Sequence, residues 1–364
     1  MKPKRAVFIT GATGFLGSYL LKLFLENGNK AYALARSKAD KSARERIIDM
    51  LHFWDGAIPD KGYLKHLEVV EGDIIFPGLG MRPESDIKRI ISEVEIIFHS
   101  AALAELRTPL EVIRKINAEG TRNVLDFALI CRENGRLLKV NHISTAYVAG
   151  DKNGIDFSED MLELGQGFHN TYEQTKYEAE LIVKEYIQKG LNISIFRPSM
   201  VMGASTDGKT NNFRLFYEPL HFFAHSVYDI FPANLKCFQN FINIDTVAKA
   251  LFLLFEYPKP RVFHLISPGN ISIGFLMKSA ANYFKFKMPK CIPEEKFDFE
   301  GLTPAQKALA QPYLPYFNYN TNFLSKETQG ILKEYDFRFP KIEKRNLTRI
   351  FQYCDRVGFI KIRN

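Results

Sequence analysis

The sequence predicts an α/β fold: a doubly wound parallel sheet, with a smaller irregular lobe formed by the C-terminal part of the chain. Three observations indicate this. In residues 6–203, apolar runs alternate with segments of helical periodicity. The runs are almost continuously apolar, as in parallel strands that are buried on both faces. A glycine-rich turn, Gly11–Gly17, separates the first run from the first helical segment, as in doubly wound sheets.

Each element of the pattern can be assigned in order. The apolar runs predict six strands: Ala6–Thr10, Lys30–Arg36, His66–Ile74, Val94–Ala102, Leu137–Thr145 and Asn192–Gly203. The segments between them predict five helices: Phe15–Asn27, Ser42–Trp54, Pro83–Val94, Pro109–Asn134 and Thr171–Gly190. In the third helix, Glu84 or Ser85 is expected near the cap.

After Gly203 the alternation stops. Residues 205–213 form a polar loop, and residues 214–241 are dense in aromatic side chains. A helix at Ile242–Glu256 and a strand at Arg261–Ser267 follow. We therefore expect two domains: residues 1–203, to which residues 241–266 return, and a substrate lobe of residues 204–364.

The composition restricts the classes of partner. The 364 residues carry a net charge of +8, which favours anionic partners such as phosphorylated cofactors. The charges are scattered, so no nucleic acid partner is expected. The four cysteines lie far apart, as expected of reduced thiols rather than of disulfides or a metal site. No apolar run approaches the length of a membrane span, and the N-terminus does not look like a signal peptide. These features predict a cytoplasmic protein without a metal.

The glycine turn predicts a dinucleotide site, and with it the Rossmann form of the fold. Gly11 permits the sharp turn, Gly14 lets a pyrophosphate approach the backbone, and Gly17 allows close packing of helix on strand. The second strand ends in Ala35 and Arg36, without the acid that binds the ribose hydroxyls of NAD. Because arginine suits a 2′-phosphate, the sequence favours NADPH.

Four side chains predict the chemistry. Tyr172 and Lys176 lie four residues apart, on one face of a predicted helix. Ser144 and Thr145 end the strand that precedes this helix. Reduction of a carbonyl develops an oxyanion, which needs a proton donor. Tyr172 is the expected donor, with a pKa lowered by Lys176. Thr145 would hydrogen-bond the substrate oxygen, and Ser144 is the alternative.

These motifs resemble the extended short-chain dehydrogenase/reductase superfamily. The finer resemblance is to its thioester reductase and fatty acyl reductase branch, the male sterility type. It rests on "GATGFLGSYLL", "LEVVEGDIIFPGLGM", "IIFHSAAL", "INAEGTRNVLDFA", "VNHISTAYVAG", "NTYEQTKYEAELIV" and "IFRPSMVMG". The resemblance implies NADPH-dependent reduction of an acyl thioester, on coenzyme A or on an acyl or peptidyl carrier protein in trans, to an aldehyde or an alcohol.

The resemblance also implies which residues bind the cofactor. Asp73 matches the acid that contacts the adenine, and Asn117 matches a structural asparagine near the active site. For His99, a packed and hydrogen-bonded role is preferred to a catalytic one. The full expected set is Gly11, Thr13, Gly14, Phe15, Leu16, Gly17, Arg36, Asp73, Ile74, Ser100, Ala101, Ala102, Asn117, Tyr172, Lys176, Arg197, Pro198 and Ser199.

Several alternatives stay open. An extended reductase or epimerase acting on a ketone, a sterol-like compound or a nucleotide sugar would use the same Thr145, Tyr172 and Lys176. A non-catalytic NADP sensor is a third reading. The aromatic stretch at Phe222, Phe223 and Tyr228 fits an acyl tunnel and ordinary core packing equally well. The length of the acyl chain and the oligomeric state of the protein are not predicted.

Overall fold

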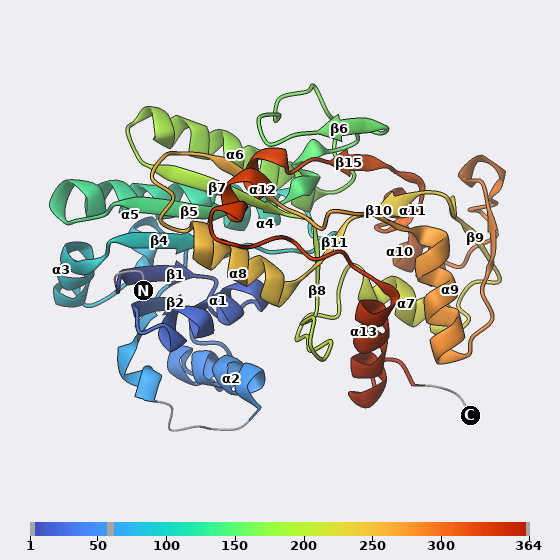
Figure 1. Ribbon diagram of the computed structural model, residues 1–364, viewed down its shortest axis with the longest axis horizontal. Helices are drawn as coiled ribbons and strands as arrows, with labels where there is room; N and C mark the ends of the chain where they lie inside the picture. The colour runs from blue at the N-terminus through green and yellow to red at the C-terminus, as the bar shows by residue number, and fades with distance from the viewer. Residues whose placement is uncertain (1–3, 57–61, 362–364) are drawn as a thin grey trace. The chain divides into compact units, whose positions relative to one another are not determined.

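The apolar runs form one sheet, in the strand order β12-β7-β5-β4-β1-β2-β3 (Figure 1). Its strands are β1 Ala6–Thr10, β2 Lys30–Ala35, β3 Leu67–Glu71, β4 Ile96–His99, β5 Lys139–Ile143, β7 Ile193–Pro198 and β12 Val262–Leu265. From β3 to β7 all neighbours pair in parallel. The computed structural model describes residues 4–56 and 62–361. The predicted doubly wound sheet is confirmed.

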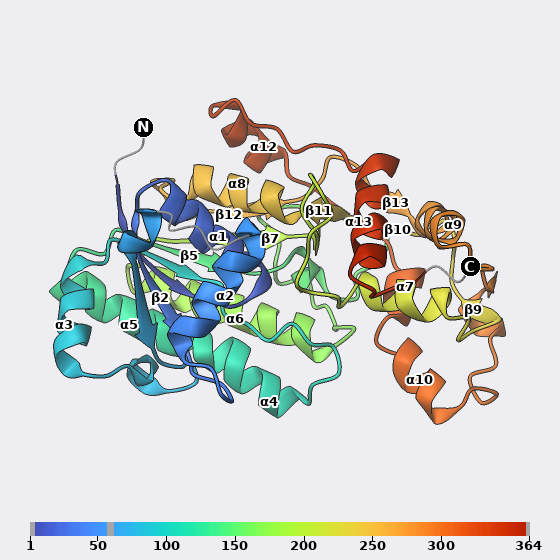
Figure 2. The ribbon, with the colours of Figure 1, turned by 90° about the horizontal axis from the view of Figure 1, so that it is seen from below.

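Helices cover both faces of this sheet (Figure 1). They are α1 Phe15–Glu26, α2 Ala43–Asp55, α3 Glu84–Glu93, α4 Leu110–Arg114, α5 Gly120–Asn134, α6 Thr171–Gln188 and α8 Ile244–Leu254. On one face, the Phe8 ring of β1 packs on Phe127 of α5, with ring centroids 5.2 Å apart. On the other, Phe24 of α1 packs on Phe98 of β4 at 5.0 Å. Figure 2 shows α1 and α2 side by side. Apolar burial on both faces therefore explains the unbroken apolar runs.

Two helices differ from the prediction. The helix expected over Pro109–Asn134 is interrupted by a π-helical turn, η3 Lys115–Glu119, between α4 and α5. Such turns are often found at functional sites, and this one contains Asn117. The helix expected over Pro83–Val94 begins one residue later, because Pro83 is its N-cap, without a side-chain hydrogen bond, and Glu84, expected near the cap, is its first residue.

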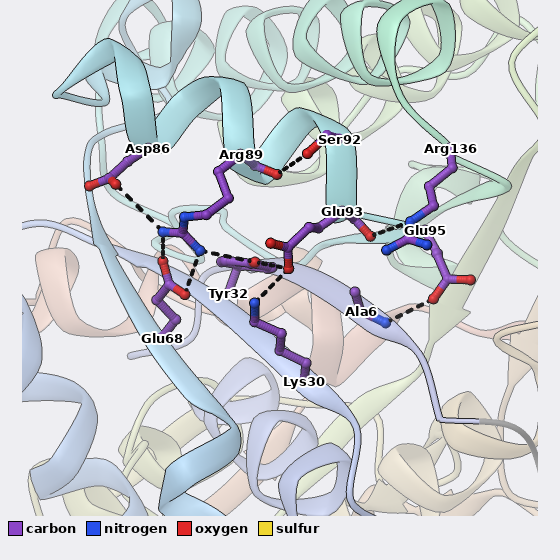
Figure 3. A network of polar contacts seen from close by, with 10 residues as sticks. All are labelled: Ala6, Lys30, Tyr32, Glu68, Asp86, Arg89, Ser92, Glu93, Glu95 and Arg136. Carbon is purple, nitrogen blue, oxygen red and sulfur yellow. Dashed lines mark hydrogen bonds and ion pairs between the residues drawn. The ribbon is translucent and has the colours of Figure 1, made fainter.

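A polar network joins α3 to the starts of β2 and β3 (Figure 3). The Glu93 carboxylate accepts hydrogen bonds from Lys30 Nζ at 2.5 Å and Tyr32 Oη at 2.6 Å. These bonds hold the pKa of Glu93 below its usual value. Arg89 binds the Glu68 carboxylate through both terminal nitrogens. The network therefore fixes α3 at the end of the sheet opposite to the glycine turn.

The remaining segments form short elements. The strands pair as β6 Ile155–Phe157 with β15 Thr321–Phe323, β8 Met200–Met202 with β11 Phe241–Asn243, β9 Ile230–Pro232 with β14 Lys290–Ile292, and β10 Phe238–Gln239 with β13 Ile271–Ser272. The helices are α7 Tyr217–Ala224, α9 Ile273–Phe284, α10 Pro304–Ala310, α11 Leu314–Asn318, α12 Lys326–Lys333 and α13 Lys344–Arg356. Short 3₁₀ turns are η1 Gly62–His66, η2 Pro77–Gly80, η4 Ala146–Ala149 and η5 Glu294–Lys296.

Contacts divide the chain into two units. The first unit contains the described residues up to Val148, with Thr171–Arg197 and Ala248–Phe263. The second unit contains Ala149–Asn170, Pro198–Val247 and the described residues from His264 onward. The division differs from the expected boundary at residue 203, because the single strand expected there is two strands. β7 ends at Pro198, which has no N–H for the ladder, and β8 pairs with β11 instead.

Candidate functional site

Neighbouring backbone atoms leave no room for side chains at two glycines of the turn. Gly11 has a φ of +75°, and a Cβ there would lie 2.6 Å from the Ala101 nitrogen. A Cβ at Gly17 would lie 2.2 Å from the Gly11 oxygen. Gly14 is the N-cap of α1, and the first turn of this helix carries no acidic residue. The first amides of α1 therefore form a site for an anion.

A cavity of about 220 Å³ lies beside this turn in the first unit. Its lining comes from the end of β2, from the residues that follow β1, β2, β3 and β4, and from Arg46 of α2 and Ile116 of η3. Nine of the expected cofactor residues line it: Gly11, Thr13, Gly14, Arg36, Asp73, Ile74, Ser100, Ala101 and Ala102. Three others, Phe15, Leu16 and Gly17, follow on α1, where the Phe15 ring lies 6.0 Å from the ring of Trp54. The glycine turn and the cavity beside it together fit a dinucleotide.

Two arginines stand at the end of β2. Arg36 Nη1 lies 2.9 Å from Asp73 Oδ2, and the Arg36 side chain is 59% exposed. Arg46 of α2 donates to the Arg36 carbonyl at 2.6 Å and to Thr13 Oγ1 at 3.4 Å. Burial lowers the pKa of Arg46, and the neighbouring Arg36 cation lowers it further. Arg46 also lines the cavity, and the sequence analysis missed it because helical spacing does not show that a side chain reaches back to the sheet.

The four expected catalytic residues belong to the first unit. A side-chain hydrogen bond from Thr145 lowers the pKa of the Tyr172 phenol. Among the described residues, Ser144 Oγ is buried without a hydrogen-bond partner. Burial raises the pKa of Tyr172 to about 12, Glu173 adds to this, and only the bond from Thr145 opposes it. The phenol is therefore protonated at neutral pH, and the lowering by Lys176 that the sequence analysis expected is not seen.

Lys176 is buried and points to the sheet. Its Nζ donates to the Ile143 carbonyl at the end of β5, at 2.8 Å. Burial lowers its pKa to about 8, and the Glu180 carboxylate partly opposes this shift. At neutral pH the side chain is still mainly an ammonium, and it lies one helical turn after Tyr172.

The last three residues of the expected cofactor set, Arg197, Pro198 and Ser199, have structural contacts elsewhere. Arg197 is 1% exposed and is held by Glu180, with Nη2 to Oε2 at 2.7 Å and Nε to Oε1 at 2.9 Å. This buried pair braces α6 against β7. Pro198 and Ser199 belong to the second unit, where the Ser199 amide donates to the Leu265 carbonyl at 3.1 Å. None of the three lines the cavity of the first unit.

An apolar cavity of about 40 Å³ lies within the second unit. Its lining includes no charged side chain: Met200, Leu215, Phe216, Pro219, Leu220, Phe223, Gln239, Phe241, Ile273, Leu276, Met277, Tyr313, Tyr316 and Phe317. Two tyrosine hydroxyls of this lining are engaged elsewhere, Tyr313 with Glu218 and Tyr316 with Asn170. Of the aromatic stretch singled out in the sequence, only Phe223 lines the cavity. Phe222 and Tyr228 are buried in the aromatic core around Phe231.

The sequence of residues 9–251, more than half of the chain, matches the family described as male sterility protein. The chain belongs to this family. The recognition made from the sequence motifs is confirmed, and with it the class: an NAD(P)-dependent oxidoreductase domain of the extended short-chain type with a nicotinamide cofactor.

Its relatives are mostly longer reductases. The chain is 32% identical over 218 residues to a carboxylic acid reductase of Segniliparus rugosus, covering 54% of this chain and 18% of that protein. It is 29% identical over 227 residues to the fatty acyl-CoA reductase wat of Drosophila melanogaster, covering 54% of this chain and 43% of that protein. The chain thus spans less than half the length of these curated relatives.

Solved structures show the same fold. The terminal R domain of the myxalamid PKS-NRPS biosynthetic pathway superposes with a TM-score of 0.84 at 24% identity, covering 100% of this chain and 94% of that one. A thiolation-reductase di-domain from an archaeal non-ribosomal peptide synthetase gives a TM-score of 0.78, also at 24% identity, covering 99% of this chain and 77% of that one.

No helix among residues 4–56 and 62–361 has the length and apolar character to cross a bilayer. The same residues contain no cluster of three or more histidine, cysteine or acidic side chains placed to hold a metal ion.

Proposed function

We propose that this chain reduces an acyl thioester to an aldehyde or alcohol with NADPH. The observation that carries the proposal is that Thr145, Tyr172 and Lys176, the last bonded to the end of β5 at Ile143, lie in the same unit as a cavity fitted to a dinucleotide. Membership of the male sterility family and likeness to a carboxylic acid reductase and a fatty acyl-CoA reductase support the choice of substrate.

The preference for NADPH rests on charge. Arg36 and Arg46 place two guanidinium groups at the end of β2, and β2 itself ends in Ala35 without an acid. A 2′-phosphate would accept charge-assisted hydrogen bonds from such a pair. A ribose 2′-hydroxyl would leave the two cations without an anion apart from Asp73, which already binds Arg36.

The residues of the chain then have separate roles. The cofactor, when bound, supplies a hydride to the thioester carbonyl. Tyr172 hydrogen-bonds the carbonyl oxygen and gives it a proton as negative charge develops. Thr145 orients the Tyr172 phenol and the substrate oxygen, and Lys176 holds the catalytic helix to the end of β5 through the Ile143 carbonyl. The hemithioacetal then collapses to an aldehyde and a thiol, and a second round of reduction would give the alcohol.

The apolar cavity of the second unit is the proposed site of the acyl chain. It contains no charged side chain, so it favours an uncharged aliphatic group over a charged aminoacyl group. The thioester would be carried on coenzyme A or on a carrier protein, and the likeness to a thiolation-reductase di-domain supports the latter. The four free cysteines fit a reducing compartment such as the cytoplasm.

The test is loss of NADPH absorbance with a panel of acyl-CoAs, acyl-pantetheines, aldehydes and ketones, with a thiol reagent present. Oxidation of NADPH that releases one thiol per aldehyde formed would support the proposal. Turnover of ketones with no reaction of thioesters would contradict it and would favour a general extended reductase. The same panel with NADH tests the cofactor preference.

A further inference from the structure

A buried chain of hydrogen bonds runs through the first unit, and His99 stands at its centre. Thr10 Oγ1 lies 2.8 Å from His99 Nδ1, and Thr121 Oγ1 lies 2.9 Å from His99 Nε2. All three side chains are at most 1% exposed. None of them lines the dinucleotide cavity, so the proposed mechanism does not use them.

The direction of every bond at the histidine follows from its neighbours. The Thr121 hydroxyl donates to the Asn117 carbonyl at 2.6 Å, so its oxygen must accept a proton from His99 Nε2. His99 Nδ1 then carries a lone pair and accepts the hydroxyl proton of Thr10. The Thr10 oxygen in turn accepts the Ala101 amide at 3.3 Å. His99 is thus a neutral imidazole with its proton on Nε2.

The charge state of His99 agrees with this direction. Burial lowers the pKa of His99 to about 3, and the Lys176 cation adds to the shift. The imidazole therefore remains neutral throughout the physiological range, and no second proton disturbs the bond from Thr10.

On the far side, the chain reaches α6. Asn117 accepts the Leu103 amide with Oδ1 at 2.7 Å and donates from Nδ2 to Thr175 Oγ1 at 3.0 Å. Thr175 lies directly before Lys176, and its hydroxyl donates to the Thr171 carbonyl at 2.8 Å. The π-helical turn η3 brings Asn117 into this position.

We propose that His99 is a positioning residue that keeps two parts of the site in register, namely the cavity loop Ser100–Leu103 and the helix that carries Tyr172 and Lys176. It acts through Thr10 on the loop and through Thr121 and Asn117 on the helix. The inference rests on the proposed reductase function for its kinetic readout, but not for its structural readouts.

Two substitutions of His99 each remove one of its two hydrogen bonds and keep the other. In His99→Asn, the side-chain oxygen can occupy the place of Nδ1 and keep the bond from Thr10, while the bond to Thr121 is lost. In His99→Gln, the amide nitrogen can occupy the place of Nε2 and keep the bond to Thr121, while the bond from Thr10 is lost. Thr121→Val and Thr10→Val remove the same two hydrogen bonds, one each, without changing the histidine.

The expected result is a split between binding and turnover. The loss of one net hydrogen bond corresponds to about a tenfold effect. His99→Gln and Thr10→Val should therefore raise the Kd of NADPH about tenfold, and His99→Asn and Thr121→Val should lower kcat about tenfold. Binding is followed by quenching of the single tryptophan, Trp54, which lies in the same unit. The proposal would be overturned if all four variants showed the same rise in Kd and the same fall in kcat, or if none of them changed either quantity.

The tautomer is tested on the protein without substrate. Nitrogen chemical shifts of ¹⁵N-labelled histidine should show a proton on Nε2 of His99 and no titration above pH 5. A proton on Nδ1, or a titration near the ordinary pKa of histidine, would contradict the inference even if the reductase assay succeeds. If no thioester is reduced, the shifts and the NADPH affinities still decide this inference separately from the proposed function.

Discussion

The two cavities of this chain are built in different ways. The cavity of the first unit is lined mainly by short continuous segments, namely the glycine turn and the residues at or after the ends of β2, β3 and β4. The cavity of the second unit is lined by residues scattered over β8, α7, β10, β11, α9 and α11 and the loops beside them. The first is therefore specified by short motifs and is expected to bind a fixed ligand. The second can change with single substitutions and is expected to determine the substrate.

The comparison is tested most strongly at Tyr172, which should act on turnover and not on cofactor binding. Tyr172→Phe removes the proton donor, and general acid catalysis contributes about 100-fold or more. We expect kcat to fall by about 100-fold or more, with the Kd of NADPH unchanged. Tyr186→Phe on the same helix is the control, because its hydroxyl bonds Asp126. Equal turnover of the wild type and Tyr172→Phe would remove Tyr172 from the mechanism.

The second prediction concerns the buried Lys176 and the pH dependence of stability. Its pKa is about 8 in the folded chain and near its ordinary value when unfolded, so between these values the unfolded state binds more protons. The free energy of unfolding of the wild type should therefore rise from pH 8 to pH 10.5 by about 2–3 kcal/mol relative to Lys176→Met. Urea titrations followed by Trp54 fluorescence measure this.

The control for this pH effect is Lys184→Met, at an exposed position of the same helix. It should retain the rise of the wild type. A rise that also persists in Lys176→Met would show that other groups cause it.

The third prediction tests which side chain gives the cavity of the first unit its selectivity between NADPH and NADH. Arg46→Ala should raise the Kd of NADPH about tenfold, by the loss of one charge-assisted contact, and leave the Kd of NADH unchanged. Arg44→Ala, at an exposed position of the same helix, is the control. Equal weakening of both cofactors by Arg46→Ala would place Arg46 outside the 2′-phosphate site.

The fourth prediction tests whether the cavity of the second unit binds the acyl chain. Each methylene buried contributes about 0.8 kcal/mol, so kcat/KM should rise about fourfold for each carbon added to a straight acyl chain until the cavity is filled. Met277→Ala should move this limit to longer chains, whereas Met277→Leu, which conserves volume, should not. A series of acyl-CoAs assayed with all three proteins shows the limit. An identical limit in all three would exclude this cavity as the acyl site.

The sequence could predict features formed by continuous segments, but not features formed by residues that are distant along the chain. The strands and the helix after the glycine turn are local patterns, and the structure has them where they were predicted, except that the strand expected over Asn192–Gly203 is two strands. Arg46 was missed because it reaches the cavity from the next helix. The π-helical turn at Asn117 was missed because one extra residue in a helical turn leaves the apolar spacing almost unchanged. Of the aromatic stretch considered for an acyl tunnel, only Phe223 lines the apolar cavity, whose lining runs from Met200 to Phe317. No local pattern joins such distant residues.

The interleaving of the two units has a consequence for biosynthesis. The sheet of the first unit is completed by β12, and the ribosome makes this strand only after Pro198–Val247, which belongs to the second unit. Until then β7 is an edge strand whose free hydrogen-bonding groups can pair with other chains. A nascent chain halted in this interval should therefore be the species most prone to aggregation and most dependent on chaperones. Swapping substrate lobes between relatives would likewise require three separate grafts, not a single fusion point.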